Sequence, residues 1–569
     1  MTTVEPKRHL LALAAPAALV TALLAAAPAP GQPRQFERQA RPETGIRINT
    51  IGYLPGEVKR ATVVGATAAR FTLVDVTSGE VAFTGTLGEA RHHADSQEEV
   101  RTADFTEHRE AGEYALRVEG LPDSAPFRIA PGVYNESLRL IMAGFYGQRC
   151  GVPVKLEHDG ITYEKKACHL KDGYLDHYDP TRAGERKDGT GGWHDAGDYG
   201  KYVVNAAFAT GIMLKAWEHY GEALARLELP IPEADGPLPD YLAEVKFNLD
   251  WLLKMQFPDG RVSHKLTRTN FSPMVMPSAD EEKRYYVSWG TEATAGLAAV
   301  TAQAARVFEP FDAEYAARNR EVAELAMEAL RERWQEVSPD QSAFRTGGYL
   351  KPARSDRTWA LVEMWETTGD ERTRGWLERF LTGDNYLVDV DWDWGEGKNL
   401  GIYTYLQSAR ERSPAVVEGL EEDLMAAADR IVRTHDRHGY GRGLRSYYWG
   451  ANGGVARTFL NLLMAERLTG ERRYRDVAID QLAYLYGRNP YARSFVTGDG
   501  HHPPMFPHHR PSVADGIEAP WPGHLVGGAN PTELDWHDET EDPRTNENAI
   551  NWDASLVYAL AAVYDPAVE

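Results

Sequence analysis

Cysteine and long apolar runs are both scarce in this chain of 569 residues, which has only two cysteines. So few cysteines exclude a disulfide-rich scaffold. The long apolar run from Leu10 to Ala27 follows Lys7 and Arg8, and no second run of that kind occurs. The run approaches the length of a membrane span, but Pro16 and the Ala- and Pro-rich exit favour a signal peptide over residues 1–30. We therefore expect a secreted protein, extracellular or periplasmic, with no membrane contact after cleavage.

Positive charge is also lacking, since the formal net charge is −22. Such a charge opposes binding to phosphate backbones, so we expect no nucleic-acid partner. Apolar residues make up 43% of the chain, which is typical of a globular protein. The 14 Trp and 27 Tyr residues exceed what core packing requires, and flat rings of this kind stack well on sugar faces.

The composition divides the chain into regions. Residues 31–44 are rich in Pro, Gln, Arg and Ala and are interpreted as a linker. Short alternating runs separated by Gly and Pro turns predict a small β-sandwich over residues 45–131. From residue 135 to residue 569, apolar residues recur every three or four positions, and about a dozen helices are predicted. Long loops rich in Trp, Asp and Gly favour an all-α toroid, although periodicity alone equally allows a solenoid or an irregular bundle.

The most informative motif is the stretch Trp193–Asp198, with the sequence WHDAGD. Only small residues separate Asp195 from Asp198, so a sharp turn can point both carboxylates into one space to hold one water. Paired carboxylates suit general-base chemistry because one acid orients or tunes the other. The structural alternative is an Asx-turn loop that caps the following helix, and the motif alone favours neither.

A second candidate acid, Glu547, stands at the start of an apolar helix beginning near Asn548. At that position it could simply stabilise the helix dipole, which position alone favours. In a groove against Trp side chains it would instead be desolvated, with a raised pKa that suits a general acid. Between the two acid sites, residues 494–512 combine Pro with several His and Arg residues. This loop is interpreted either as a His-rich metal-binding surface or as fixed donors to sugar hydroxyls.

Together these motifs resemble glycoside hydrolase family 9, the inverting cellulases. Residues 193–198, residues 494–510 and Asn546-Glu547 before an apolar helix occur in the order of that family. Residues 48–55 likewise resemble the opening of the immunoglobulin-like domain in one branch of it. The resemblance implies a multidomain protein, with a small all-β immunoglobulin-like sandwich followed by an all-α (α/α)6 barrel. The barrel would have an open cleft for β-1,4-linked glucans.

The resemblance also assigns roles to the acids. Asp198 resembles the general base, Asp195 its helper in holding the nucleophilic water, and Glu547 the general acid. An inverting reaction needs the two carboxyl groups about 6.5–9.5 Å apart, with a water between base and sugar. Acids so distant in sequence can meet only if the helical domain closes on itself.

Four further residues take expected places around the acids. His508 and Arg510 match the active-site His-x-Arg of the family, with Arg510 expected to contact substrate. Asp538 matches the acidic residue that precedes the catalytic Glu. Trp449 resembles an aromatic residue of the substrate cleft, and the alternative is a core tryptophan.

Cys150, Cys168, His169 and His194 supply four ligands that suit a tetrahedral zinc ion. The immunoglobulin-bearing branch resembles this chain here too, with a structural Cys2His2 zinc. A disulfide is the alternative, but it leaves both histidines unexplained. The resemblance also allows calcium, yet residues 346–352 lack the usual acids and Asp356 is followed by Arg357, so we expect that site to be weak or absent.

The sequence thus predicts a secreted, monomeric inverting hydrolase that cleaves β-1,4-glucosidic bonds of cellulose and cello-oligosaccharides as an endoglucanase. The alternative enzyme is an exo-acting β-glucosidase, glucosaminidase or cellobiohydrolase on the same scaffold. A carbohydrate-binding protein that has lost catalysis is a third hypothesis, which the presence of all three acids opposes.

Overall fold

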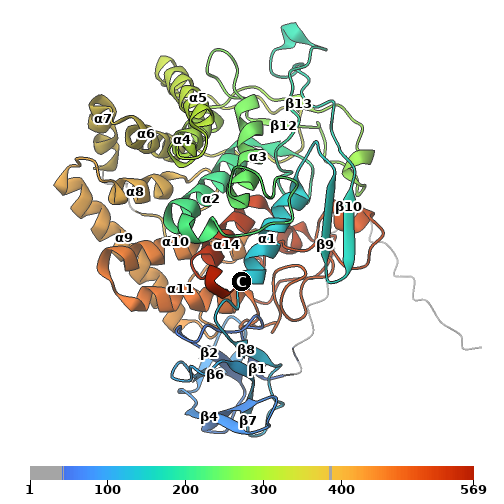
Figure 1. The fold of residues 1–569 in the computed structure, drawn as a ribbon, viewed down its shortest axis with the longest axis vertical. Helices are drawn as coiled ribbons and strands as arrows, with labels where there is room; N and C mark the ends of the chain where they lie inside the picture. Colours follow the sequence, from blue (N-terminus) through green and yellow to red (C-terminus); the bar gives the residue numbers. More distant parts are fainter. Residues whose placement is uncertain (1–41, 43, 383–387, 569) are drawn as a thin grey trace, which may run out of the picture. The chain divides into compact units, whose positions relative to one another are not determined.

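The computed structural model describes residues 42, 44–382 and 388–568. The predicted signal peptide (1–30) lies outside these residues, and so does the predicted linker (31–44) except for Pro42 and Thr44. A β-sandwich and a helical domain follow, within one compact unit. Figure 1 shows the sandwich strands in blue and the helical domain from cyan to red.

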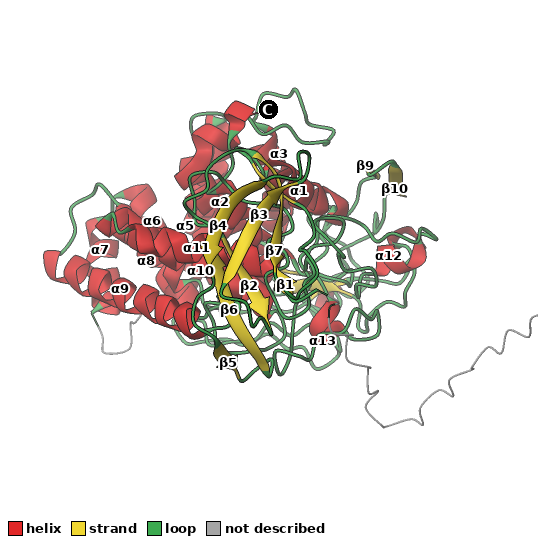
Figure 2. Ribbon diagram, turned by 90° about the horizontal axis from the view of Figure 1, so that it is seen from below, coloured by secondary structure: helices red, strands yellow, loops and turns green. Residues whose placement is uncertain are grey.

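The sandwich consists of two four-stranded antiparallel sheets, whose strands are yellow in Figure 2. One sheet has the order β1 (Ile46–Arg47), β2 (Arg60–Val64), β6 (Glu98–Asp104) and β5 (Arg91–His93). The other has the order β4 (Val81–Thr86), β3 (Arg70–Asp75), β7 (Gly112–Val118) and β8 (Phe127–Ile129). Alternate residues such as Phe71, Leu73 and Leu116 form the core between the sheets, as the period of two predicts.

The helical domain is a double ring, which confirms the predicted (α/α)6 architecture. Each inner helix packs on inner neighbours: α14 on α2, α2 on α4, α4 on α6, α6 on α8, and α10 on α14. The six inner helices are α2 (Val203–Leu224), α4 (Thr291–Phe308), α6 (Arg354–Thr368), α8 (Lys398–Gln407), α10 (Ala451–Thr469) and α14 (Ile550–Ala561). The six outer helices are α1 (Asn135–Gln148), α3 (Asp240–Lys254), α5 (Ala313–Glu332), α7 (Glu371–Leu381), α9 (Pro414–Arg437) and α11 (Arg472–Leu485).

The helices of the inner ring are more completely buried than those of the outer ring. Every residue of α14 is buried, and so is nearly every residue of α4, because both helices are enclosed by others. The outer helices α5 and α9 bury only one stripe, with charged residues on the other side. Because α14 closes the ring, the segment just before it is carried next to the start of α2.

Short elements in the loops position the site. A hairpin, β9 (Val154–His158) and β10 (Ile161–Lys165), follows α1. A three-stranded sheet joins β11 (Lys201–Tyr202), β12 (Lys265–Thr267) and β13 (Tyr285–Tyr286). Two short helices, α12 (Arg510–Ala514) and α13 (Pro543–Asn546), lie in the C-terminal loops. Three 3-10 turns complete the elements: 180–182, 277–279 and 566–568.

Polar contacts join the sandwich to the helical domain. The Thr62 hydroxyl donates to the Gly439 carbonyl oxygen at 3.0 Å, and the Thr50 amide donates to the Tyr486 carbonyl oxygen at 2.9 Å. The Arg60 guanidinium lies 2.9 Å from the buried Asp480 carboxylate. Burial would raise the pKa of that carboxyl, but the charge of Arg488, the hydrogen bond to His435 and the charge of Arg60 together hold it well below its usual range. The junction is therefore held by specific polar pairs.

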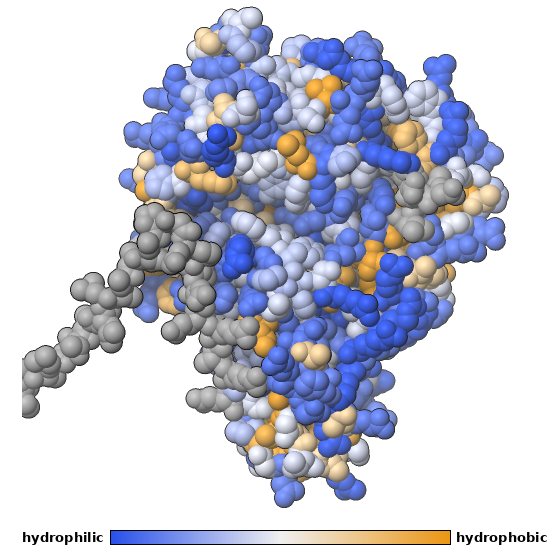
Figure 3. All heavy atoms as spheres, turned by 180° about the vertical axis from the view of Figure 1, so that it is seen from behind, coloured by the Kyte–Doolittle hydropathy of each residue, from blue (hydrophilic) through white to orange (hydrophobic). Residues whose placement is uncertain are grey.

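No helix within the described residues is long and apolar enough to cross a bilayer. On the face shown in Figure 3 most of the surface is hydrophilic and the apolar residues are scattered. Isolated exposed apolar side chains of this kind are ordinary for folded proteins.

Candidate active site

The loop that carries the two aspartates turns sharply before β11. The Asp195 amide donates to the Gly200 carbonyl oxygen at 3.0 Å, which closes the turn. Both carboxylates are buried, with Asp195 only 2% exposed. The Gly200 amide donates to Asp198 Oδ2 at 2.9 Å, so the predicted Asx-turn is present as well. The motif therefore serves the local turn and also points two acids into one space.

Glu547 reaches this loop through backbone pairing. Ala196 and Ala549 form an antiparallel bridge, and the Ile550 amide donates to the Asp195 carbonyl oxygen at 2.9 Å. Glu547 has extended backbone between α13 and α14, not the helical start that the sequence predicts. It therefore does not act on the dipole of α14. The chain instead sets its carboxyl group beside the aspartates.

The surroundings of Glu547 favour its protonated form. Burial raises the pKa of Glu547 well above its usual value, and the negative charges of Asp198 and Asp195 add to the effect. The positive charge of Arg510 and a hydrogen bond from the Gly197 amide lower this pKa in part. A carboxyl group that stays protonated near neutral pH can donate a proton.

Asp195 is held from two sides. The Tyr349 hydroxyl donates to its Oδ2 at 2.5 Å, and the Asn205 amide donates to its Oδ1 at 2.7 Å. Burial and then the charge of Asp198 raise the pKa of Asp195 to about 8. The charge of Asp198 therefore acts on both Asp195 and Glu547.

The loop of residues 494–512, called the histidine loop below, packs directly on the turn that carries Asp195 and Asp198. The His508 amide donates to the Asn546 carbonyl oxygen at 2.8 Å, and its Nδ1 donates to the Thr540 carbonyl oxygen at 2.6 Å. Burial lowers the pKa of His508, so the ring is neutral. The Arg510 guanidinium donates to the Gly197 carbonyl oxygen at 2.6 Å. His508 and Arg510, both predicted for the site, therefore lie against the turn that carries Asp195 and Asp198.

Asp538 holds the histidine loop in place. Its carboxylate accepts the amides of Met505 and Phe506 at 2.9 Å each, the Arg493 side chain at 3.0 Å and the Asn546 side chain at 3.0 Å. These donors fix the Asp538 carboxylate against the histidine loop, and the catalytic role that the sequence predicts for Asp538 stays a prediction.

Trp449 stands just before α10, and 48% of it is exposed. This exposure excludes the core alternative. It leaves the ring available to a sugar face.

Sequence reasoning missed four polar residues that contact the aspartates or lie beside them: Tyr202, Asn205, Lys265 and Tyr349. In the sequence, only the pair Gly347-Gly348 before Tyr349 indicated an unusual turn. In the structure, Tyr349 has a left-handed φ of 47°. A non-glycine residue in that conformation is often held there for function. The other three depend on tertiary pairing that no local pattern reveals.

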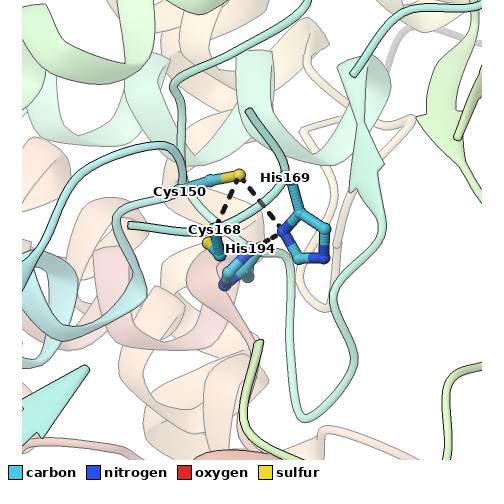
Figure 4. Close-up of side chains that lie close together, drawn as sticks. All are labelled: Cys150, Cys168, His169 and His194. Carbon is cyan, nitrogen blue, oxygen red and sulfur yellow. Dashed lines mark hydrogen bonds between the residues drawn. The ribbon is translucent and has the colours of Figure 1, made fainter. Parts of the chain in front are cut away.

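The predicted metal ligands converge, as Figure 4 shows. The Sγ atoms of Cys150 and Cys168 are 4.0 Å apart, too far for a disulfide. Nδ1 of His169 lies 3.6 Å from Cys150 Sγ and 3.4 Å from Nε2 of His194, which lies 3.9 Å from Cys168 Sγ. A tetrahedral zinc ion requires edges of about 3.8 Å for S···S, 3.6 Å for S···N and 3.4 Å for N···N. The four side chains therefore fit a metal ion.

The charge state of His194 agrees with the geometry. Burial, followed by the charge of Lys165, lowers the pKa of His194 well below its usual value, so the ring stays neutral and able to ligate. Nε2 of His169 lies 3.5 Å from the Asp280 carboxylate, an arrangement that orients a ligating histidine.

A second cluster at the domain junction combines His93, Asp95, His438 and Glu533. Nε2 of His93 donates to Glu533 at 2.7 Å, which is a hydrogen bond and too short for a tetrahedral edge. The backbone amides of Gly439 and Tyr440 donate to Nδ1 of His93 and His438, so in the neutral rings Nε2 carries the proton. This cluster is therefore a hydrogen-bonded contact between domains.

Comparison with known proteins identifies the family. Residues 134–560 match glycosyl hydrolase family 9, and residues 41–123 match the cellulase N-terminal ig-like domain. The chain belongs to glycosyl hydrolase family 9. It is therefore a glycoside hydrolase, with the domain order that the sequence predicts.

Named relatives cover most of this family 9 chain. It is 43% identical over 524 residues to endoglucanase D of Acetivibrio thermocellus, covering 91% of this chain and 83% of the relative. It is 33% identical to a xyloglucan-specific endo-beta-1,4-glucanase of Bacteroides ovatus, covering 92% and 94%. Among solved structures, a metagenome-derived family 9 endoglucanase superposes with a TM-score of 0.86 at 34% identity, covering 91% and 98%.

Gly197 provides a test of the packing at this family 9 site. A Cβ atom at Gly197 would lie 1.8 Å from the His508 carbonyl oxygen, so Gly197→Ala must separate the aspartate turn from the histidine loop. We expect a loss of hydrolysis of about 100-fold or more, since small misplacements are costly in a preorganised site. The measurement is kcat/KM on cello-oligosaccharides.

Gly375→Ala is the matched control, because nothing lies within 4 Å of a Cβ there and Gly375 is inside α7. It should keep full activity and gain about 0.5–1 kcal/mol of stability. Full activity of Gly197→Ala would contradict the close packing described for the site.

Proposed function

We propose that this protein is an endo-acting, inverting β-1,4-glucanase. Both named relatives are called endoglucanase or endo-beta-1,4-glucanase, which supports the substrate class. The single observation that carries the proposal is the bridge of Ala196 to Ala549, which holds Glu547 beside Asp195 and Asp198. The same observation disfavours a carbohydrate-binding protein without catalysis, because a binding site has no use for a protonated acid facing two carboxylates.

The proposed reaction uses the acids in separate roles. Asp198 takes a proton from a water that attacks the anomeric carbon, and Asp195 orients that water. Glu547 donates its proton to the oxygen of the departing sugar, on the opposite face of the ring. Arg510 and Trp449 contact the sugar chain. His508, neutral and anchored through Nδ1, presents Nε2 as a hydrogen-bond acceptor to a sugar hydroxyl.

We propose that the metal held by Cys150, Cys168, His169 and His194 is zinc, with a structural role. Two thiolates and two neutral imidazoles neutralise a divalent ion, and zinc favours this set in tetrahedral sites. The Cys150 amide donates to the Gly192 carbonyl oxygen at 2.7 Å, and His194 directly precedes Asp195. The bound ion would pin the segment that carries the catalytic base.

We also propose that the protein is exported and acts as a monomer on β-glucan outside the cytoplasm. The basis is the N-terminal pattern of Lys7 and Arg8 before the apolar run. A polymeric substrate that cannot enter cells agrees with export.

Endo action predicts internal cuts. On carboxymethylcellulose, the viscosity should fall well before reducing ends accumulate, and cellohexaose should yield products of several lengths. Release of only glucose or only cellobiose, with slow loss of viscosity, would instead support the exo-acting alternative.

The assigned acids predict strong effects of isosteric changes. Glu547→Gln and Asp198→Asn should each lower kcat by about 10²–10⁴-fold, because general acid or base catalysis contributes on that order. Circular dichroism and melting temperature check that the fold is kept. Substrates with a very acidic leaving group should recover part of the rate in Glu547→Gln but not in Asp198→Asn. Near-normal hydrolysis by either variant would refute its role.

The zinc proposal predicts one zinc ion per chain by elemental analysis. Cys168→Ser should lose the metal, lower the melting temperature and reduce activity, because the base loop is no longer pinned. Lys155→Ser, on the exposed hairpin of β9 and β10, is the control and should keep both metal and activity. A Cys150–Cys168 disulfide found by mass spectrometry would contradict the proposal.

A further inference from the structure

The proposed catalytic base is held by residues outside the recognised motifs. The Tyr202 hydroxyl donates to Asp198 Oδ2 at 2.9 Å, the same oxygen that accepts the Gly200 amide. Both hydrogen bonds are therefore accepted by Oδ2. Oδ1 is the oxygen left to take the proton of a water.

Tyr202 is itself oriented by the loop at Gly347. The Gly347 amide donates to the Tyr202 hydroxyl oxygen at 3.1 Å. A hydroxyl group that accepts one hydrogen bond donates its own proton more strongly, since hydrogen bonds in a chain polarise one another. The series from Gly347 through Tyr202 to Asp198 therefore fixes both the position and the polarity of the donor.

Lys265 completes the arrangement from the neighbouring strand. The register of β11 and β12 pairs Tyr202 with Lys265 directly. The Lys265 side chain is fully buried, and its ammonium donates to the Gly347 carbonyl oxygen at 2.7 Å and lies 5.7 Å from the centre of the Tyr202 ring. Gly347 is therefore held by two hydrogen bonds: its amide donates to Tyr202, and its carbonyl oxygen accepts from Lys265.

A buried ammonium group is costly unless a negative charge compensates it. Burial lowers the pKa of Lys265 to about 8, and Asp198 is the acid whose charge opposes that shift.

We infer that Tyr202 and Lys265 are positioning residues for the catalytic base: Tyr202 holds Oδ2 of Asp198, which leaves Oδ1 for the water, and Lys265 holds Gly347, which orients the Tyr202 hydroxyl. This inference rests on the proposed role of Asp198. It adds a function for two residues that make no direct contact with the reacting atoms.

The effect on pH dependence has a definite sign. A base acts in its ionised form, so activity is lost as pH falls through the acidic limb of the profile. The Tyr202 hydroxyl donates to the carboxylate, and Lys265 holds that donor in place through Gly347, so a variant of either residue weakens a hydrogen bond to the ionised form and should move the acidic limb upward. The titratable groups that interact with Asp198 are Asp195, Tyr199, Tyr202, Lys265, Tyr349, His508 and Glu547.

The test compares pH profiles of kcat/KM on a soluble cello-oligosaccharide for the wild type, Tyr202→Phe and Lys265→Met. Each variant should move the acidic limb upward by about one pH unit, which is about a tenfold loss below the limb and much less on the plateau. The basic limb, assigned to Glu547, should stay in place in Tyr202→Phe. The double variant should lose less than the product of the single losses, because both residues act through Gly347.

Lys215→Met is the matched control. Lys215 is also buried, but it lies on α2 and donates to Thr404 Oγ1 at 2.6 Å, away from the acids. It should lower stability without moving either limb. If Lys265→Met does not fold, Tyr202→Phe, which deletes one oxygen atom, decides the question.

A loss of activity that is uniform over pH, with an unmoved acidic limb, would overturn the inference. Asp198→Asn separates this failure from that of the proposed function. If Asp198→Asn is inactive and the limb does not move, only the inference fails. If Asp198→Asn is active, the proposed function itself fails.

Discussion

The site depends on one backbone contact between two distant parts of the chain. The bridge of Ala196 to Ala549 and the hydrogen bond from the Ile550 amide to the Asp195 carbonyl oxygen hold the segment of Glu547 against the loop of Asp195 and Asp198. Both partners are main-chain groups, so the backbone itself sets how closely the two segments approach. Side-chain size matters at the neighbouring Gly197, where a Cβ atom would lie 1.8 Å from the His508 carbonyl oxygen.

The bridge exists because the inner ring closes. Helix α14 follows the bridge directly and packs on α2, which begins a few residues after the aspartate loop, and on α10. The complete burial of α14 explains its composition, since a helix enclosed on all sides needs apolar residues around its whole circumference. The packing that closes the inner ring therefore also brings Glu547 next to the two aspartates.

Much of this architecture was predictable from the sequence. Ten of the twelve ring helices coincide with the segments whose apolar periodicity is clearest in the sequence: 137–148, 202–220, 241–255, 291–307, 315–335, 358–368, 416–434, 455–468, 473–486 and 548–564. None of these segments covers α7 or α8. Helix α8 is buried on nearly every side and so has no polar face to mark it, while α7 is short and its stripe consists of few residues. The motifs also named the acids, because small spacers and paired carboxylates are local features. Glu547 was placed in a helix because the apolar pattern of α14 begins close behind it, whereas the bridge to Ala196 keeps the backbone extended there.

The residues that pattern reading missed share a physical cause. Tyr202 and Lys265 are brought together by the register of two short strands, and Gly347 comes from a third segment. Nothing in a strand of two or three residues specifies its partner, so these contacts belong to the tertiary structure alone. The loop of Asp195 and Asp198 is consequently held by the bridge to Ala549 and by Tyr202, and the proposed metal ion at His194 would add a third restraint. A loop with charged groups at its tip would otherwise sample many conformations, and each restraint removes some of that freedom before substrate arrives. The acids are therefore recognisable from short motifs, while the preorganisation that makes them effective is built from residues scattered through the helical domain.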